Sequence, residues 1–262
     1  MRHCGIVLLL IATVSASGFA QIRAPQATGP ALPTPRLADG TPNLGPTEPN
    51  KGYWIPKQFQ DYVAVLVDAR EIPYQPWAKA LSDYRKLTAS KFDPQGYCLP
   101  PAGSRLMTTP YPMEILQMPE QKRIVMIYEG GAHLWRIIYM DGREHPKGDN
   151  LTPTWMGHSV GHWEKDTLVV DVVGFNEGTW IDMVGDPHTS QFHLIERYTR
   201  TDMRTLHYEA TIDDPGAYTR PWKIQFDIAW DPNSEIQEYI CQENNRWQDS
   251  LMESLKKEAN GK

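Results

Sequence analysis

Residues 154–176, TWMGHSVGHWEKDTLVVDVVGFN, decide how this chain folds. Gly157, Gly161 and Gly174 punctuate two apolar runs, and the polar triplet at 164–166 separates those runs. This pattern predicts two strands joined by a tight turn. Long segments rich in polar and aromatic residues flank the pair. Because short turns on one side and long loops on the other build a site at one end of a sheet, we expect function at the long-loop end.

The first twenty residues predict a secretory signal peptide. An apolar run at 6–14 follows a short polar start and ends near the small-x-small sequence at 18–20. That run is too short to span a bilayer. We therefore expect a periplasmic or secreted protein with no membrane insertion after removal of the signal. The formal net charge of −6 argues against nucleic acid as a partner.

The remainder of the chain predicts a proline-rich tether or strap at 21–50 and a single domain at 51–262. Helices are expected at 76–87, where Pro76 favours a helix start, and at 244–258. The chain between them indicates strands, most clearly at 221–230, where apolar and polar residues alternate. The expected strands are 113–118, 123–130, 133–140, 158–164, 167–175, 191–201, 205–213, 221–230 and 235–241.

The lengths of the connections predict the fold class. Four connections are short, at 131–132, 165–166, 202–204 and 231–234, and three are long, at 141–157, 176–190 and 214–220. In an antiparallel meander successive connections lie at alternate ends of the sheet. We therefore expect an all-β protein, a curved sheet or lipocalin-like barrel with helices at its edges and all the long loops around one mouth.

Cys98 and Cys241 remain after the signal peptide, which carries the third cysteine, is removed. An even pair in an exported chain predicts a Cys98–Cys241 disulfide. A loop of this length contributes roughly 4–5 kcal/mol of stability in the chain-entropy model.

The long loops and neighbouring strand ends hold aromatic and ionisable residues suited to a small-molecule pocket. The expected catalytic residues are His193, His188, Asp182 and Arg197. The expected ligand-binding residues are His145, Trp155, Asn176, Trp180, Tyr218 and Arg220.

In this hypothesis Asp182 orients a histidine for acid–base work, and Arg197 holds an oxyanion. His193 and Arg197 share a strand face, which looks either into the barrel or outward to water. The sequence leaves that choice open.

The chain lacks the motifs of several site classes. It contains no Walker loop, dinucleotide GxGxxG or CxxC motif. No histidine spacing matches a metal motif such as HExxH, and the pair His158 and His162 has no evident third ligand. We therefore expect neither a metal nor another cofactor.

The motifs PTWMGHSVGHWEKDTLVVDVVGFN, LPPAGSRLMTTPYP and TIDDPGAYTRPW together resemble those of a family of secreted bacterial proteins. The resemblance covers roughly residues 70–245 and implies a shared fold. It carries over no activity and no catalytic residue.

These expectations lead to three hypotheses about function. The first is an exported enzyme that performs cofactor-free acid–base chemistry (a lyase, hydratase, isomerase or hydrolase) on a small molecule. The second is a periplasmic binding or carrier protein without catalysis, and the third is an interaction module of the cell envelope. The sequence leaves the oligomeric state open.

Overall fold

The computed structural model describes residues 32–47, 51–56, 62–67, 71–88, 91–243 and 245–260. The predicted signal peptide and the parts of the predicted strap at 21–31 and 48–50 lie outside these residues. Among the described residues, no helix is both long and apolar enough to cross a membrane.

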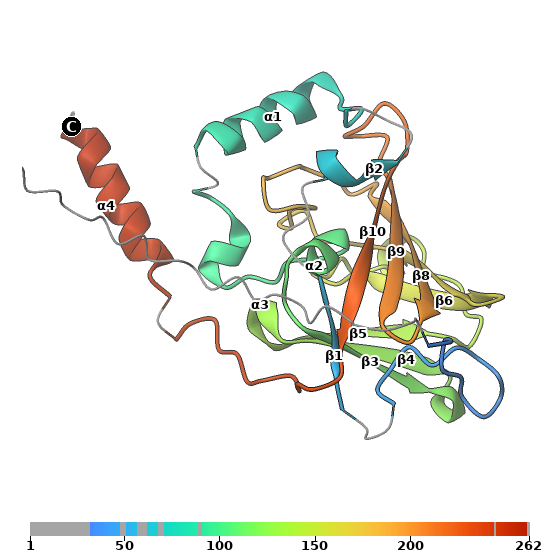
Figure 1. The fold of residues 1–262 in the computed structure, drawn as a ribbon. Coiled ribbons are helices and arrows are strands. Elements are labelled where there is room, and N and C mark those ends of the chain that lie inside the picture. Colours follow the sequence, from blue (N-terminus) through green and yellow to red (C-terminus); the bar gives the residue numbers. More distant parts are fainter. Residues whose placement is uncertain are drawn as a thin grey trace, which may run out of the picture.

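A closed β-barrel forms the body of the protein (Figure 1). The strands are β1 (Tyr53–Pro56), β2 (Leu66–Val67), β3 (Met113–Met118), β4 (Arg123–Tyr128), β5 (Leu134–Tyr139), β6 (His158–Glu164), β7 (Thr167–Val173), β8 (His193–Asp202), β9 (Thr205–Asp213) and β10 (Trp222–Asp231). The short strand β1 closes the barrel, because it pairs with both β10 and β3. Strand β2 is an additional strand beside β10.

Helices and turns accompany the barrel, and the two long helices lie to one side of it (Figure 1). They are α1 (Pro76–Leu87), α2 (Ser104–Thr108), α3 (Gly130–His133) and α4 (Trp247–Ala259), with 3-10 turns η1 (Val63–Val65), η2 (Pro94–Tyr97), η3 (Pro119–Gln121) and η4 (Gly148–Asn150). The predicted all-β barrel and its two edge helices are therefore confirmed.

The barrel interior is a packed core. On β9 the residues Leu206, Tyr208, Ala210 and Ile212 are fully buried, whereas the polar row that alternates with them is only partly buried. The five apolar residues of the expected strand at 221–230 are likewise buried on β10. The polar rows therefore face outward, which answers the question that the sequence left open.

One pair of neighbouring strands departs from the expected antiparallel meander. Strands β5 and β6 are parallel, with Ile138 opposite Ser159 and Tyr139 opposite Val160. A parallel pair needs a crossover connection, so residues 140–157 run from one end of the barrel to the other. The short β4–β5 connection consequently lies at the same end as the long loops, and the expected separation of short and long connections was wrong at this turn.

The strand expected at 235–241 is absent, because residues 234–240 form no strand. The physical reason is barrel closure: β1 occupies the free edge of β10, where a further strand would have paired. The four residues of β1 are too few to give a strand pattern in the sequence.

Residues 32–47 pack against the end of the barrel opposite the long loops. The guanidinium of Arg200 donates hydrogen bonds to the carbonyls of Asn43 and Gly45 at 2.6 and 3.1 Å. It also lies over the rings of Trp54 and Trp230. Burial lowers the pKa of Arg200 to about 10. This part of the proline-rich segment is therefore a strap that closes the barrel end.

A buried ion pair links two walls of the barrel interior. Arg136 on β5 donates to Glu196 on β8 at 2.6 Å, and both side chains are at most 2% exposed. Tyr198 and Tyr208 donate to the other carboxylate oxygen of Glu196 at 2.8 and 2.9 Å. Burying this carboxylate is tolerable because the guanidinium and both phenols satisfy it.

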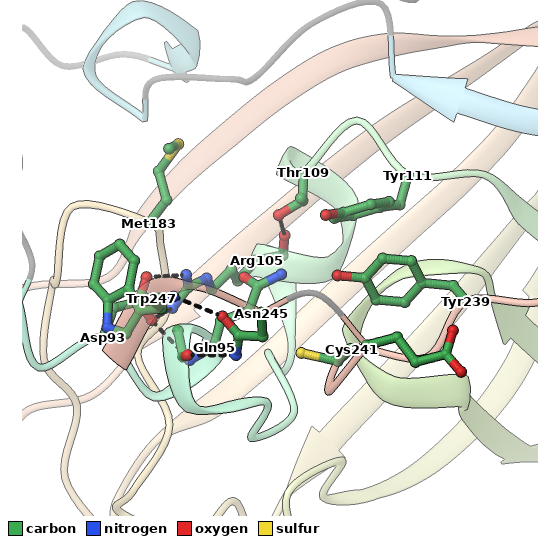
Figure 2. Close-up of a pocket in the computed structure, with 12 residues that line it drawn as sticks. Asp93, Gln95, Arg105, Thr109, Tyr111, Met183, Tyr239, Cys241, Asn245 and Trp247 are labelled. Carbon is green, nitrogen blue, oxygen red and sulfur yellow. Dashed lines mark hydrogen bonds and ion pairs between the residues drawn. The ribbon is translucent and has the colours of Figure 1, made fainter. Parts of the chain in front are cut away.

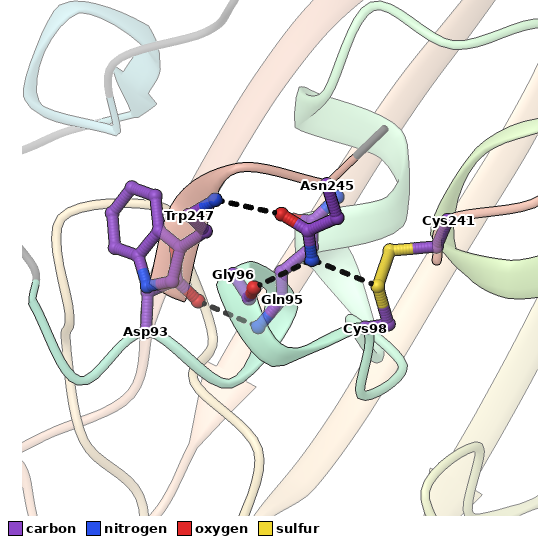
Figure 3. Close-up of a disulfide and its surroundings, with 7 residues drawn as sticks. All are labelled: Asp93, Gln95, Gly96, Cys98, Cys241, Asn245 and Trp247. Carbon is purple, nitrogen blue, oxygen red and sulfur yellow. Dashed lines mark hydrogen bonds between the residues drawn. A yellow bond between two sulfur atoms is a disulfide. The ribbon is translucent and has the colours of Figure 1, made fainter. Parts of the chain in front are cut away.

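The predicted disulfide between Cys98 and Cys241 is present, with 5.6 Å between the Cα atoms (Figure 3). It ties the chain after β10 to the turn that follows η2. The side chain of Asn245 strengthens the link by donating to the carbonyl of Gly96 at 3.1 Å. The C-terminal segment is thus held against residues 93–98.

Replacing Glu196 with Gln should destabilise the protein by about 3–5 kcal/mol, because Arg136 would keep a buried and uncompensated charge. Chemical denaturation followed by circular dichroism measures the change. The matched control is Glu164→Gln, which removes the partly exposed partner of Arg197 and should change stability by no more than about 1 kcal/mol. Equal losses of stability in the two variants would show that the buried pair is no more important for stability than the surface pair.

Candidate functional site

The expected mouth of the barrel is filled by its own side chains. Trp180, His188 and Tyr218 are 4%, 7% and 1% exposed. Trp155 lies at the same end, since a Cβ on Gly178 would come within 3.2 Å of its ring. The aromatic loop residues thus gather at one end, as expected, but they pack together instead of lining an opening.

Asp182 and His188 lie in separate hydrogen-bonded groups at this end. Asp182 accepts hydrogen bonds from the backbone amides of Gly185 and Asp186 at 2.9 and 2.8 Å. His188 bonds to the hydroxyl of Thr179 at 2.6 Å and to the carbonyl of Thr189. Burial lowers the pKa of His188. The structure therefore does not place Asp182 as the orienting partner of His188.

The other ligand-binding residues expected at the mouth have structural contacts. Asn176 accepts a hydrogen bond from the amide of Gly178 at 3.0 Å. The buried hydroxyl of Tyr218 donates to the carbonyl of Pro187. The ring of Trp180 lies beneath the guanidinium of Arg85, 4.4 Å from its centroid. Arg220 is exposed.

His193 and Arg197 point outward from β8, because Leu194, Glu196 and Tyr198 occupy the inward positions. Arg197 pairs with Glu164 on the outer wall at 2.9 Å. His193 instead joins a second group of ionisable side chains near the long-loop end. Both residues thus lie on the outward face, which is one of the two alternatives that the sequence left open.

A chain of three imidazoles and one carboxylate lies on this outer wall. Asp171 on β7 bonds through one oxygen to Nε2 of His193 at 2.7 Å and to Nε2 of His145 at 3.2 Å. Nδ1 of His145 lies 2.8 Å from Nδ1 of His158 on β6. We call these four residues the histidine chain. It brings together two expected site residues, His145 and His193.

The crossover between the parallel strands builds the histidine chain. His145 belongs to the segment 140–157 and reaches the outer faces of β6 and β7 because that segment runs along the barrel wall. Tyr139, at the end of β5, stacks on the ring of His158 with centroids 5.4 Å apart. The guanidinium of Arg143 lies over Tyr139 at 3.8 Å. An aromatic and cationic layer thus covers one side of His158.

Hydrogen-bond chemistry restricts the protonation of this chain. An ionised carboxylate only accepts, so His145 donates to Asp171 through Nε2. The remaining nitrogen of a neutral His145 is then an acceptor, and His158 donates to it through Nδ1. Nε2 of a neutral His158, at the end of the histidine chain, then carries no proton and can accept one.

The two terminal histidines have pKa values shifted in opposite directions. Burial, followed by the nearby His145 and Arg143, lowers the pKa of His158. The hydrogen bond to Asp171 raises the pKa of His193, and the charge of Asp213 adds to this effect. His193 in turn lowers the pKa of Asp171. Protonation is therefore disfavoured at His158 and favoured at His193.

The arrangement is a linear relay, in which His158 and Asp171 contact opposite nitrogens of His145. Over the ranges that the structure describes, no group of three or more histidine, cysteine or carboxylate side chains is arranged to hold a metal ion.

Asp171 is not among the expected site residues, and His158 has no expected acid–base role. Asp171 was the available signal, because it interrupts the apolar run LVVDVVGF at a position whose alternation with Val170 and Val172 places it on the outer face. The contact of His145 with His158 required knowledge of the crossover.

The chain matches no protein-family model, no curated protein and no solved structure. The site is therefore interpreted from its geometry.

Replacing Asp171 with Asn should lower the pKa of His193, because the hydrogen bond to the carboxylate is the largest cause of its elevation. The pair of His193 with Asp171 contributes its full stabilisation below pH 6.5, the ordinary pKa of histidine. This stabilisation is lost as the pH rises through the higher pKa of His193 in the folded protein. A nuclear magnetic resonance titration of the imidazole protons measures the shift. An unchanged pKa of His193 would rule out this coupling.

Asp182 should make the protein less stable as the pH rises. Burial and the neighbouring Asp186 raise the pKa of Asp182 from 3.8 to about 8. Stability is therefore greatest below pH 3.8 as far as this group is concerned, and it falls as the pH rises toward 8.

The substitution Asp182→Asn should remove up to about 1.4 kcal/mol per pH unit of this dependence. Unfolding free energies measured from pH 4 to pH 8 (roughly the range between the two pKa values) test it. Asp83→Asn on the exposed face of α1 is the control and should leave the slope unchanged. A slope that Asp182→Asn also leaves unchanged would contradict the assignment.

Proposed function

We propose that this protein is an exported enzyme that performs cofactor-free acid–base chemistry on a small molecule at the histidine chain. The observation that carries the proposal is the opposite shift of two histidine pKa values within one hydrogen-bonded chain. Titratable groups that their environments push apart in pKa are the usual acid and base of a catalytic site.

His158 is the proposed general base. Its Nδ1 proton is held by His145, which Asp171 orients in turn. This is the arrangement in which a base is oriented by a second group and its cationic form is stabilised by a carboxylate. When Nε2 takes a proton from a substrate, the resulting imidazolium is stabilised through His145 by Asp171.

His193 is the proposed general acid. Its imidazolium is stabilised by Asp171 and Asp213, so it is available to donate a proton when negative charge develops on a substrate. His193 is 33% exposed and Asp171 is 42% exposed, which keeps this end of the chain accessible. The combination supports proton abstraction and return, as in an isomerase, lyase or hydratase, and also water activation, as in a hydrolase.

The stacked layer of Arg143 and Tyr139 fixes the ring of His158, and we infer that a substrate lies at the edge of this layer. Arg143 is held in place by Asp141, whose carboxylate accepts hydrogen bonds from Nε and Nη2 at 2.9 and 2.6 Å. We infer that this layer positions substrate, whereas the imidazoles move protons.

Binding without catalysis is the second candidate function, because the structure also contains a cavity of about 350 Å³ beside the disulfide. That cavity contains no histidine. Measured turnover distinguishes the two candidate functions, because we assign catalysis to the histidine chain and binding alone to the cavity.

Purified protein should accelerate the elimination of 5-nitrobenzisoxazole, in which a base removes the carbon-bound proton and the N–O bond breaks to give a nitrile and a phenoxide. His158→Gln should reduce this rate by roughly 10²-fold or more. The rate should rise with pH through a pKa below 6.5, since the pKa of His158 is lowered.

The control is His162→Gln, which changes an exposed histidine on the same strand. It should leave the rate within about twofold of the wild-type rate. Equal rates for the two variants, or a wild-type rate no greater than that of free imidazole, would reject the proposed base.

A further inference from the structure

The cavity beside the disulfide lies between the segment that contains η2 and α2 and the chain that follows β10 (Figure 2). Its volume is about 350 Å³, which is at the lower end of the range for small-molecule sites. One wall comes from residues 93–111, through Asp93, Arg105 and Tyr111, and the other comes from residues 239–247. The pocket shares no residue with the histidine chain.

Aromatic side chains line this pocket on both walls. Tyr111 and Tyr239 lie against each other with centroids 5.6 Å apart and rings tilted by 51°. In Figure 2 the two tyrosines lie at the right of the view and Trp247 lies at the left. Both tyrosine hydroxyls point toward the side where Trp247 lies. Burial, followed by the contact with Tyr239, raises the pKa of Tyr111 to about 12, so this phenol stays neutral.

The position of Trp247 is fixed by local contacts. Its backbone amide donates to the side chain of Asn245 at 3.0 Å. The indole rests on Gly96, where a Cβ would come within 2.5 Å of the ring. Only glycine at position 96 therefore lets the indole lie this close to η2.

The charges of the lining do not cancel. Arg105 forms a two-point ion pair with Asp93 at 2.9 and 2.6 Å, and both side chains are largely buried. Each of these charges neutralises the other. Glu243, which is exposed, is the further carboxylate of the lining and leaves the pocket with surplus negative charge.

We propose that this pocket binds a small organic cation, a quaternary or protonated amine, between the tyrosine pair and Trp247. Aromatic faces attract such cations through the ring quadrupole, with tryptophan the strongest, and quaternary ammonium ions are recognised in this way. The surplus carboxylate adds a coulombic attraction, whereas an anion would be repelled. This inference does not depend on the acid–base proposal.

The disulfide completes the pocket. Cys241 is itself part of the lining, and Tyr239, Glu243 and Trp247 all belong to the segment that the bond ties to Cys98 (Figures 2 and 3). Reduction releases this segment from residues 93–98. Binding at this pocket should therefore be lost under reducing conditions, which distinguishes it from binding elsewhere on the barrel.

The test compares choline with 3,3-dimethylbutan-1-ol, which has nearly the same shape and no charge. Isothermal titration calorimetry of the oxidised protein should show choline binding roughly tenfold more tightly than the alcohol. Trp247→Ala should reduce the affinity for choline by at least the same factor. Equal affinities for the two probes, or no binding of choline, would overturn the proposal.

The charge contribution has its own matched pair of variants. Glu243→Gln should weaken choline binding by roughly threefold to tenfold. Glu238→Gln makes the same change at an exposed residue outside the lining and should have no effect. Both positions are exposed, so both variants should fold. An affinity for choline that Glu243→Gln or reduction of the disulfide leaves unchanged would also overturn the proposal.

Discussion

The parallel pairing of β5 with β6 is the constraint on which the candidate site depends. Two parallel neighbours cannot be joined by a hairpin, so residues 140–157 must travel the length of the barrel on its outside. That path brings His145 between His158 and Asp171. An antiparallel β5–β6 hairpin would leave the outer wall without this residue, and the histidine chain would lose its middle link.

The packed interior is the second constraint. The barrel lumen is filled by apolar side chains and by the Arg136–Glu196 pair, which tyrosines satisfy. A buried pair of this kind is a costly arrangement to disturb, because losing one partner leaves the other charged in a medium of low dielectric. The interior therefore serves stability. Chemistry that requires solvent access has to occur on the outside of the wall.

Much of the fold could be predicted from the sequence, because local signals determine it. Alternation on β10, the proline that starts α1 and the polar triplet at 164–166 all report structure within a few residues. The parallel pairing and the closing strand β1 could not be predicted, because both depend on contacts between distant segments.

The candidate site divides in the same way. His145 and His193 were expected on chemical grounds, but the carboxylate that joins them is Asp171 and not Asp182, because strand alternation turns His193 outward. Both proposed sites follow from one property of a closed and filled barrel. Because buried side chains fill the interior of the barrel that the structure describes, we place both proposed ligands where an added segment lies against the wall or the adjoining helices. In our proposals the crossover offers one such place around His158, and the disulfide offers another by tying the segment that carries Trp247 to the segment that carries Gly96.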